Sequence, residues 1–210
     1  MAFDYKKEYK EFYLPPQKPQ LVTIPPMNYI AVRGKGDPNE EGGEYKDAIG
    51  ILYAVAFTIK MSKKGGKEID GFFDYVVPPL EGFWKPNDGN GFNIKRKSEF
   101  IWTSVIRLPD FVSKADFDWA VQYAGQKKNK DFSKAQFLTV NEGACVQIMH
   151  IGDYDDEDRS IALMDEFISE NGYRNDFSDK RLHHEIYLSD ARRVERSRLK
   201  TVIRHPVKKI

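Results

Sequence analysis

The chain contains an internal repeat, which limits its possible folds more than any other feature. Val-Ile-Arg-x-Pro occurs twice, ending at Pro109 and at Pro206, 97 residues apart. Upstream, two strand-like runs close on Gly-Asp at Asp37 and Asp153, 116 residues apart. Self-similarity over a long period indicates a structural unit used twice. We expect two corresponding halves, with about 19 extra residues in the first, largely in the polar, Gly- and Asn-rich surface loop predicted at 85–98.

Both halves have the same predicted order of elements. A helical pattern follows each Gly-Asp, because apolar side chains recur at spacings of three and four over residues 45–59 and again over 161–168. Gly65 and Gly172 are the expected helix ends, since glycine tolerates the left-handed conformation that closes a helix. Strand-like runs rich in β-branched and aromatic residues come next. They are residues 72–78 and 100–109 in the first half, and 183–189 and 199–206 in the second.

The predicted fold class is α+β, with two tandem βαββ modules related by a pseudo-twofold axis. Each module would have an antiparallel sheet with one face covered by its own helix, which leaves the other face for a ligand cleft between the modules. Ser113 and Asp116 form a capping-box pattern that opens a connector helix. The expected divisions are an N-terminal extension at 1–20, the first module at 21–112, the connector at 113–135 and the second module at 136–210.

Composition argues against several kinds of partner. The chain has 33 Lys and Arg against 32 Asp and Glu, a formal net charge of +1, which does not favour a polyanion. The Lys-rich runs at 5–13 and 60–67 are predicted solvated faces, and no DNA- or RNA-binding motif accompanies them. No segment suits a signal peptide or a membrane span. We expect a cytoplasmic protein without direct DNA binding, membrane association or an identifiable protein partner, and a buried thiol at Cys145.

The predicted strand HHEIYLS, residues 183–189, places a carboxylate among apolar neighbours. Alternation along a strand gives it two faces. The face expected to pack against the helix has His184, Ile186 and Leu188. The face expected to meet the cleft has His183, Glu185 and Tyr187. Burying an unpartnered carboxylate is costly, which suggests a use for Glu185. The alternative is that Glu185 pairs with an arginine of ARRVERSR at the end of the strand.

Aromatic residues of the first half are the expected walls of this cleft. Phe83 and Trp84 belong to PLEGFWKP, Trp102 lies in the following strand, and Tyr53 and Phe57 lie one turn apart on the helix. Aromatic rings beside a carboxylate suit a flat, conjugated or cationic ligand, through stacking and cation–π attraction. Similar spacings are also common in ordinary cores.

We expect no metal and no cofactor. His183, His184 and Glu185 are neighbours on a strand, so their side chains point in opposite directions, and the HExxH spacing of zinc proteases is absent. The acidic stretch YDDEDR, residues 154–159, lacks the glycine and ligand rhythm of a calcium loop. It is expected at the start of a helix, where the helix dipole favours acidic groups.

Five blocks in order resemble the GyrI-like small-molecule-binding family in its free-standing form, from about Tyr9 to Val207. The blocks are VPPLEGFW, WTSVIRLPDFV, EGACVQIMHIGDYDDE, HHEIYLSD and KTVIRHPV. The resemblance implies two βαββ modules with a ligand pocket between them. It implies that Glu185 points into this pocket and meets cationic or polyaromatic compounds. By the same resemblance the pocket is lined by Trp84, Trp102, Tyr53 and Phe83. Many relatives have a proline where this chain has Ala191, and a second tryptophan where it has Lys85.

Three functions remain open, and whether the protein is an enzyme is not decided. The first is a polyspecific binding protein for hydrophobic or cationic aromatic small molecules, which protects against toxic compounds with Glu185 as the anionic anchor. The second is a hydrolase that opens cyclopropane-bearing, DNA-alkylating natural products by adding water, with Glu185 as general base and Tyr53 or Tyr187 as hydrogen-bond donor. The third is a gyrase-interacting or regulatory module. Binding ranks first because every form of the family needs the pocket. The expected ligand-binding residues are Trp84, Trp102, Tyr187, Phe83, Phe57 and Glu185.

Overall fold

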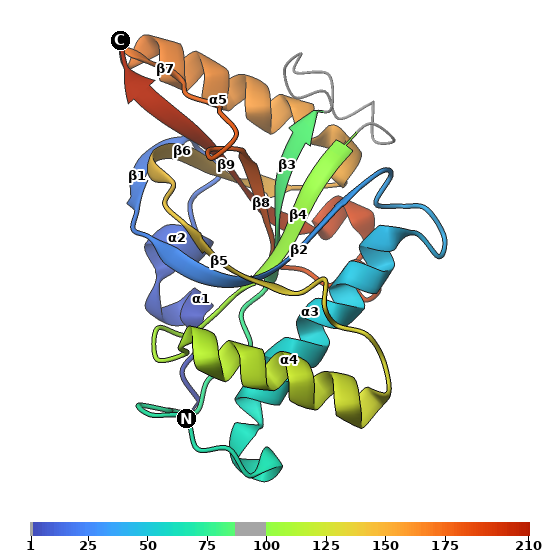
Figure 1. Ribbon diagram of the computed structural model, residues 1–210. Coiled ribbons are helices and arrows are strands. Elements are labelled where there is room, and N and C mark those ends of the chain that lie inside the picture. The colour runs from blue at the N-terminus through green and yellow to red at the C-terminus, as the bar shows by residue number, and fades with distance from the viewer. Residues whose placement is uncertain (1, 87–99) are drawn as a thin grey trace.

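A computed structural model of the chain describes residues 2–86 and 100–210 (Figure 1). Its helices are α1 (Tyr5–Glu8), α2 (Lys10–Tyr13), α3 (Glu44–Lys60), α4 (Lys114–Lys128) and α5 (Asp158–Glu170). Its strands are β1 (Gln20–Ile24), β2 (Met27–Lys35), β3 (Leu80–Pro86), β4 (Phe100–Arg107), β5 (Gln136–Val140), β6 (Gly143–Ile151), β7 (Tyr173–Asn175), β8 (His183–Tyr187) and β9 (Lys200–Lys209). The loop predicted at 85–98 lies mostly outside the described residues.

The fold is α+β, and the predicted repeat is visible in it. The first half has the order β2-α3-β3-β4 and the second has β6-α5-β8-β9. All strands belong to one antiparallel sheet, with the order β1-β6-β9-β8-β3-β4-β2-β5 and with β7 paired to β9. The halves join where β3 pairs with β8, and each half also lends a strand to the other, since β1 pairs with β6 and β5 with β2. The two expected sheets are therefore one.

The helices begin and end close to their predicted positions. Ser113 and Asp116 form the expected capping box of α4. After α3 a short 3₁₀ turn (Ser62–Gly65) follows, and the left-handed residue is Gly66, with φ of 75°, one position beyond the predicted Gly65. Gly172 takes the predicted left-handed conformation after α5, with φ of 73°.

The strand predicted at 72–78 is wrong. Within this segment only Tyr75 makes a strand-like bridge, with Phe3, and β3 begins later, at Leu80. Pro78 and Pro79 are consecutive residues without an N–H to donate to a sheet, which disfavours strand pairing at this point. The aromatic side chains of 72–75 instead pack against Phe111 and the N-terminal segment.

Both long helices of the repeat cover the same face of the sheet. In Figure 1, α3 lies against the strands of the first half and α5 lies along β7 and β9. Side chains of α3 pack on Ile30 and Ile106, and side chains of α5 pack on Ile148 and Ile203. Glu185 lies opposite Ile203 across the β8–β9 pair, so the cleft face of β8 is the helix-covered face. The expectation that His184, Ile186 and Leu188 pack against the helix is therefore wrong.

The other face of the sheet encloses a buried charged network. His184 lies between two carboxylates, 2.9 Å from Glu81 Oε2 and 3.0 Å from Glu142 Oε1. The Arg204 guanidinium donates to Glu142 Oε2 over 3.0 Å and to Gln147 Oε1. All of these side chains are buried, and their mutual pairing offsets the cost of burying charge.

The N-terminal residues close this interior. Arg204 Nη2 donates to the carbonyl of Phe12 over 2.9 Å, and Gln147 Nε2 donates to the carbonyl of Glu11. Tyr5 and Tyr13 are buried, although the run 5–13 was predicted to be a solvated face. Cys145 is a buried free thiol, as expected. None of the helices in the described ranges has the length and apolar composition needed to cross a bilayer.

Replacing Glu142 tests the network. Burial alone would raise the pKa of Glu142, but His184 and Arg204 outweigh it and lower that pKa to about 2 from a usual 4.5. Because the folded-state pKa is lowered, the stabilisation is present above pH 4.5 and is lost as the pH falls towards 2. We expect Glu142→Gln to lower the free energy of unfolding by about 3 kcal/mol at neutral pH.

Urea unfolding of both proteins between neutral pH and acid measures this difference. The gap between wild type and Glu142→Gln should narrow below pH 4.5. Glu170→Gln, an exposed change at the end of α5, is the control and should behave as wild type. A gap that is the same at every pH would contradict an ionised Glu142.

Candidate functional site

A cavity of about 1010 Å³ lies between the two halves on the helix-covered face. Its walls come from α3, from β3, and from the end of β8 with the segment that follows it to Arg192. The N-terminal residues Ala2 and Lys6 also reach it. A cavity of this size, walled mainly by apolar and aromatic groups, is typical of a small-molecule site.

One wall is a stripe of α3. Tyr45, Ile49, Tyr53 and Phe57 follow one another at intervals of four, so they lie on one side of the helix along the length of the cavity. The rings of Tyr53 and Phe57 stack with centroids 6.2 Å apart. Phe57 is 52% exposed, so the stripe runs from the interior to the mouth of the cavity.

The opposite wall contains Glu185, which is only 6% exposed. The Tyr187 hydroxyl donates to Glu185 Oε2 over 2.6 Å, and Trp84 Nε1–H donates to the Tyr187 oxygen over 3.1 Å. Burial, and next the charge of Glu185, raises the pKa of Tyr187 well above its usual value, so its hydroxyl keeps the proton that it donates. The aromatic side chains therefore fix the position of the carboxylate.

The predicted alternative is that Glu185 pairs with an arginine of 191–198. Three arginines of this segment instead pair with other carboxylates. Arg192 pairs with Asp190 at 2.9 Å, and Arg193 pairs with the same carboxylate. Arg196 pairs with Asp153. Hydrogen bonds from Tyr187 and contact with His183, rather than a salt bridge to this segment, hold Glu185 in place.

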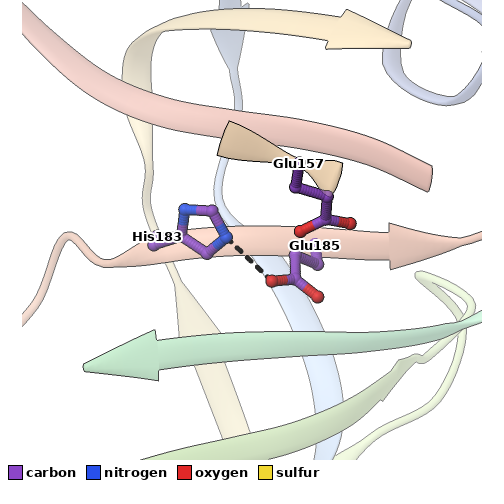
Figure 2. A group of neighbouring side chains, drawn as sticks. All are labelled: Glu157, His183 and Glu185. Atoms are coloured by element: carbon purple, nitrogen blue, oxygen red, sulfur yellow. Dashed lines mark hydrogen bonds and ion pairs between the residues drawn. The ribbon is translucent and has the colours of Figure 1, made fainter. Parts of the chain in front are cut away.

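A histidine pair and a second carboxylate adjoin Glu185. His183 Nε2 is 2.9 Å from Glu185 Oε1, and His183 Nδ1 is 2.7 Å from His205 Nε2. Burial, and then the neighbouring His183, lowers the pKa of His205 well below its usual value, so His205 is neutral. Glu157, at the start of α5, brings its carboxylate to the same place, as Figure 2 shows. One donor atom each from Glu157, His183 and Glu185 lies within 4.8 Å of the others.

The cavity brings together five of the predicted site residues. Glu185, Tyr187, Trp84, Tyr53 and Phe57 all line it. Tyr53 and Phe57 do so along α3, while the other three form the wall around the carboxylate.

Trp102 and Phe83 do not line the cavity, contrary to expectation. Trp102 is buried behind Tyr45, whose ring it meets edge-on at 5.1 Å, so it supports the wall from behind. Phe83 alternates with Trp84 along β3 and therefore points to the other face, where it stacks on His184 at 4.1 Å.

Among the lining residues that sequence reasoning did not assign to the site are Tyr45, Tyr154 and Glu157. Tyr45 had been counted only as part of the apolar stripe of its helix. Tyr154 and Glu157 follow the second Gly-Asp, and Tyr154 meets the ring of Tyr187 edge-on at 5.6 Å. The internal repeat could have indicated Tyr154 and Glu157, because in both halves the residues just after Gly-Asp lead into a helix that borders the cavity.

Gly82 lies directly beneath this wall, opposite Glu185 in the β3–β8 pair. A Cβ at this position would be 2.7 Å from Trp84 Nε1 and 3.2 Å from the Tyr187 hydroxyl. We expect Gly82→Ala to displace both side chains, to change near-ultraviolet circular dichroism, and to cost about 1–3 kcal/mol of stability by overpacking.

Gly50→Ala is a matched control for this substitution. Gly50 lies in α3, and a Cβ there would meet nothing within 4 Å. This change should leave the spectrum intact and stabilise the helix by about 0.5–1 kcal/mol. Equal effects of the two substitutions would contradict the close approach at Gly82.

A family model and solved structures both match this chain over nearly its whole length. The family model described as GyrI-like small molecule binding domain matches residues 17–208. A crystal structure titled as a hydrolase from Listeria innocua is 43% identical, with a TM-score of 0.89, over 99% of this chain and 100% of its own. A structure titled as an uncharacterized conserved protein from Listeria innocua is 45% identical, with a TM-score of 0.91, over the same shares of both chains.

A more distant likeness shows the fold alone. The C-terminal domain of EcmrR is 14% identical, with a TM-score of 0.57, over 92% of this chain and 98% of its own. Curated protein sequences give no match.

Proposed function

Because the chain belongs to the GyrI-like small-molecule-binding domain family, we propose that it is a polyspecific binder of planar, hydrophobic and often cationic compounds. In this proposal it protects against toxic molecules by holding them in the cavity between its halves. The observation that supports it best is the buried carboxylate of Glu185 in an aromatic wall.

Two features of the site support the proposal: Glu185 has no Lys or Arg partner among the described residues, and the cavity wall contains aromatic rings. Tyr187 and His183 contact the two oxygens of Glu185, and since no lysine or arginine in the described part of the chain pairs with this carboxylate, it retains attraction for a cation. The stacked rings of Tyr53 and Phe57 line the cavity and offer stacking surface for a flat ring system, and cation–π attraction adds to it. Apolar walls that adapt to several flat shapes favour breadth rather than selectivity.

Binding of a planar cationic dye tests the proposal. We expect tryptophan emission to be quenched, and Glu185→Gln to weaken binding by about tenfold to a hundredfold, because a charged contact is replaced by a neutral one. A neutral dye of the same shape should bind wild type and Glu185→Gln alike. Glu170→Gln is the control for an unrelated loss of charge. If the Gln variant binds the cationic dye as wild type does, Glu185 is not the anchor.

A second function, hydrolysis of cyclopropane-bearing alkylating compounds, is favoured by the full-length similarity to a Listeria innocua protein titled as a hydrolase. In this scheme Glu185 accepts a proton from a water molecule whose oxygen attacks a ring carbon. One carbon–carbon bond of the ring breaks, and its electron pair moves into a conjugated carbonyl, whose oxygen then takes up a proton. The product has gained one water. A tyrosine, Tyr53 or Tyr187, would donate a hydrogen bond to the forming charge.

Tyr187 donates its one hydroxyl proton to Glu185 and so positions that carboxylate, which leaves Tyr53, of the two, as the tyrosine that can donate to the forming charge. Burial raises the pKa of Tyr53, and the charged groups that act on this pKa are Arg192 and Asp190. Tyr53 therefore lies nearer the segment after β8, suited to holding the far part of a planar substrate.

Mass spectrometry of a cyclopropane-containing alkylator incubated with the protein separates the two functions. Hydrolysis predicts a product heavier by one water and more than one product molecule per chain. Glu185→Ala should slow it by about 10²- to 10⁴-fold, the usual contribution of a general base. Binding without product formation, or equal rates in wild type and variant, would reject the hydrolase and leave the binding protein.

A further inference from the structure

We propose that the acidic end of the cavity binds one divalent transition-metal cation, of which Zn²⁺ is the type, through Glu157, His183 and Glu185. One donor atom from each residue lies within 4.8 Å of the other two, and all three side chains are buried (Figure 2). The proposal rests on the proposed function in one respect, since both use Glu185. It adds a ligand class that the family description does not include.

The set of donor atoms fits this class of metal. Imidazole nitrogen and carboxylate oxygen are both ligand types that Zn²⁺ accepts, and three protein ligands with one open position is the arrangement of catalytic zinc sites. His183 Nε2 and Glu185 Oε1 are in hydrogen-bond contact at 2.9 Å, and they would separate to about 3.4 Å around a tetrahedral ion with bonds of about 2.0–2.2 Å. Calcium, which takes six to eight oxygens, fits less well.

The ligands are already oriented by neighbours. His183 Nδ1 is 2.7 Å from His205 Nε2, which leaves Nε2 of His183 as the nitrogen that faces the carboxylates. The Tyr187 hydroxyl donates to Glu185 Oε2 and leaves Oε1 on the side of the cluster. Metal-bound histidines and carboxylates are usually held by such outer hydrogen bonds.

Electrostatics favours a doubly charged occupant. Two carboxylates close together in a buried place repel each other, and a dication between them turns that repulsion into attraction. The two glutamates come from two elements of the second half, the start of α5 and β8, so the fold brings together charges that are far apart along the chain. Four cationic residues line the cavity, Lys6, Lys46, Lys60 and Arg192, and of these Lys60 pairs with Asp74 and Arg192 with Asp190.

Two consequences follow from the position of the cluster. Glu157 and Glu185 line the cavity, so the open coordination position faces it and is available to water or to an oxygen or nitrogen of a bound molecule. A metal ion and a cationic dye would both need Glu185, so each should weaken the binding of the other.

Cobalt and zinc titrations of EDTA-treated protein test the site. We expect one ion per chain by equilibrium dialysis, and for Co²⁺ a visible d–d absorption typical of four-coordination. Glu157→Gln and His183→Gln should each weaken binding by at least about tenfold, while Glu170→Gln should not. Circular dichroism of each variant checks that it is folded.

Competition between Zn²⁺ and the cationic dye can be measured on wild-type protein alone. This test remains valid even if both variants fail to fold. Zn²⁺ should raise the apparent dissociation constant of the cationic dye. Absence of stoichiometric binding and of a Co²⁺ spectrum, or full binding by folded Glu157→Gln, would overturn the proposal. Dye binding measured in EDTA, and its dependence on Glu185, tests the proposed function separately, so the two can fail independently.

Discussion

The pairing of β3 with β8 is the contact on which the rest of the structure depends. It joins the halves into one sheet and sets Gly82 opposite Glu185. Because cross-strand neighbours share a face, this register places Trp84 of β3 on the same face as the carboxylate of β8. A shift of one residue would send Glu185 to the opposite face and remove it from the cavity.

The same strand separates two kinds of buried charge. On one face His184 is enclosed by Glu81, Glu142 and Arg204, a network whose charges pair with one another and which fastens the N-terminal residues to the sheet. On the other face Glu185 receives a hydrogen bond from a neutral tyrosine and borders open space. Paired charges serve the fold, whereas a carboxylate kept beside a cavity retains attraction for something that enters it.

Much of the fold and part of the site could be predicted. Helix periodicity, the capping box and the β-branched runs are local signals, and they located α3, α4, α5 and most of the strands. The segment 72–78 misled because its strand-forming residues precede two prolines. Trp84 and Phe83 are adjacent, so pattern alone could not say which one faces the cavity. Glu157 gave no local signal, since its role depends on a strand about thirty residues later.

The sequence by itself determined that the chain has two corresponding βαββ halves, and that Glu185 and Tyr187 lie on one face of a strand, because repeat and alternation are properties of neighbouring residues. Only the tertiary structure decided that both helices cover the cavity face, that the halves share one sheet, and that Glu157 and His205 approach Glu185 and His183. These relations arise from the packing of segments that are distant in the sequence. The free energy gained when such segments bury apolar surface against each other cannot be read from the spacing of neighbouring residues.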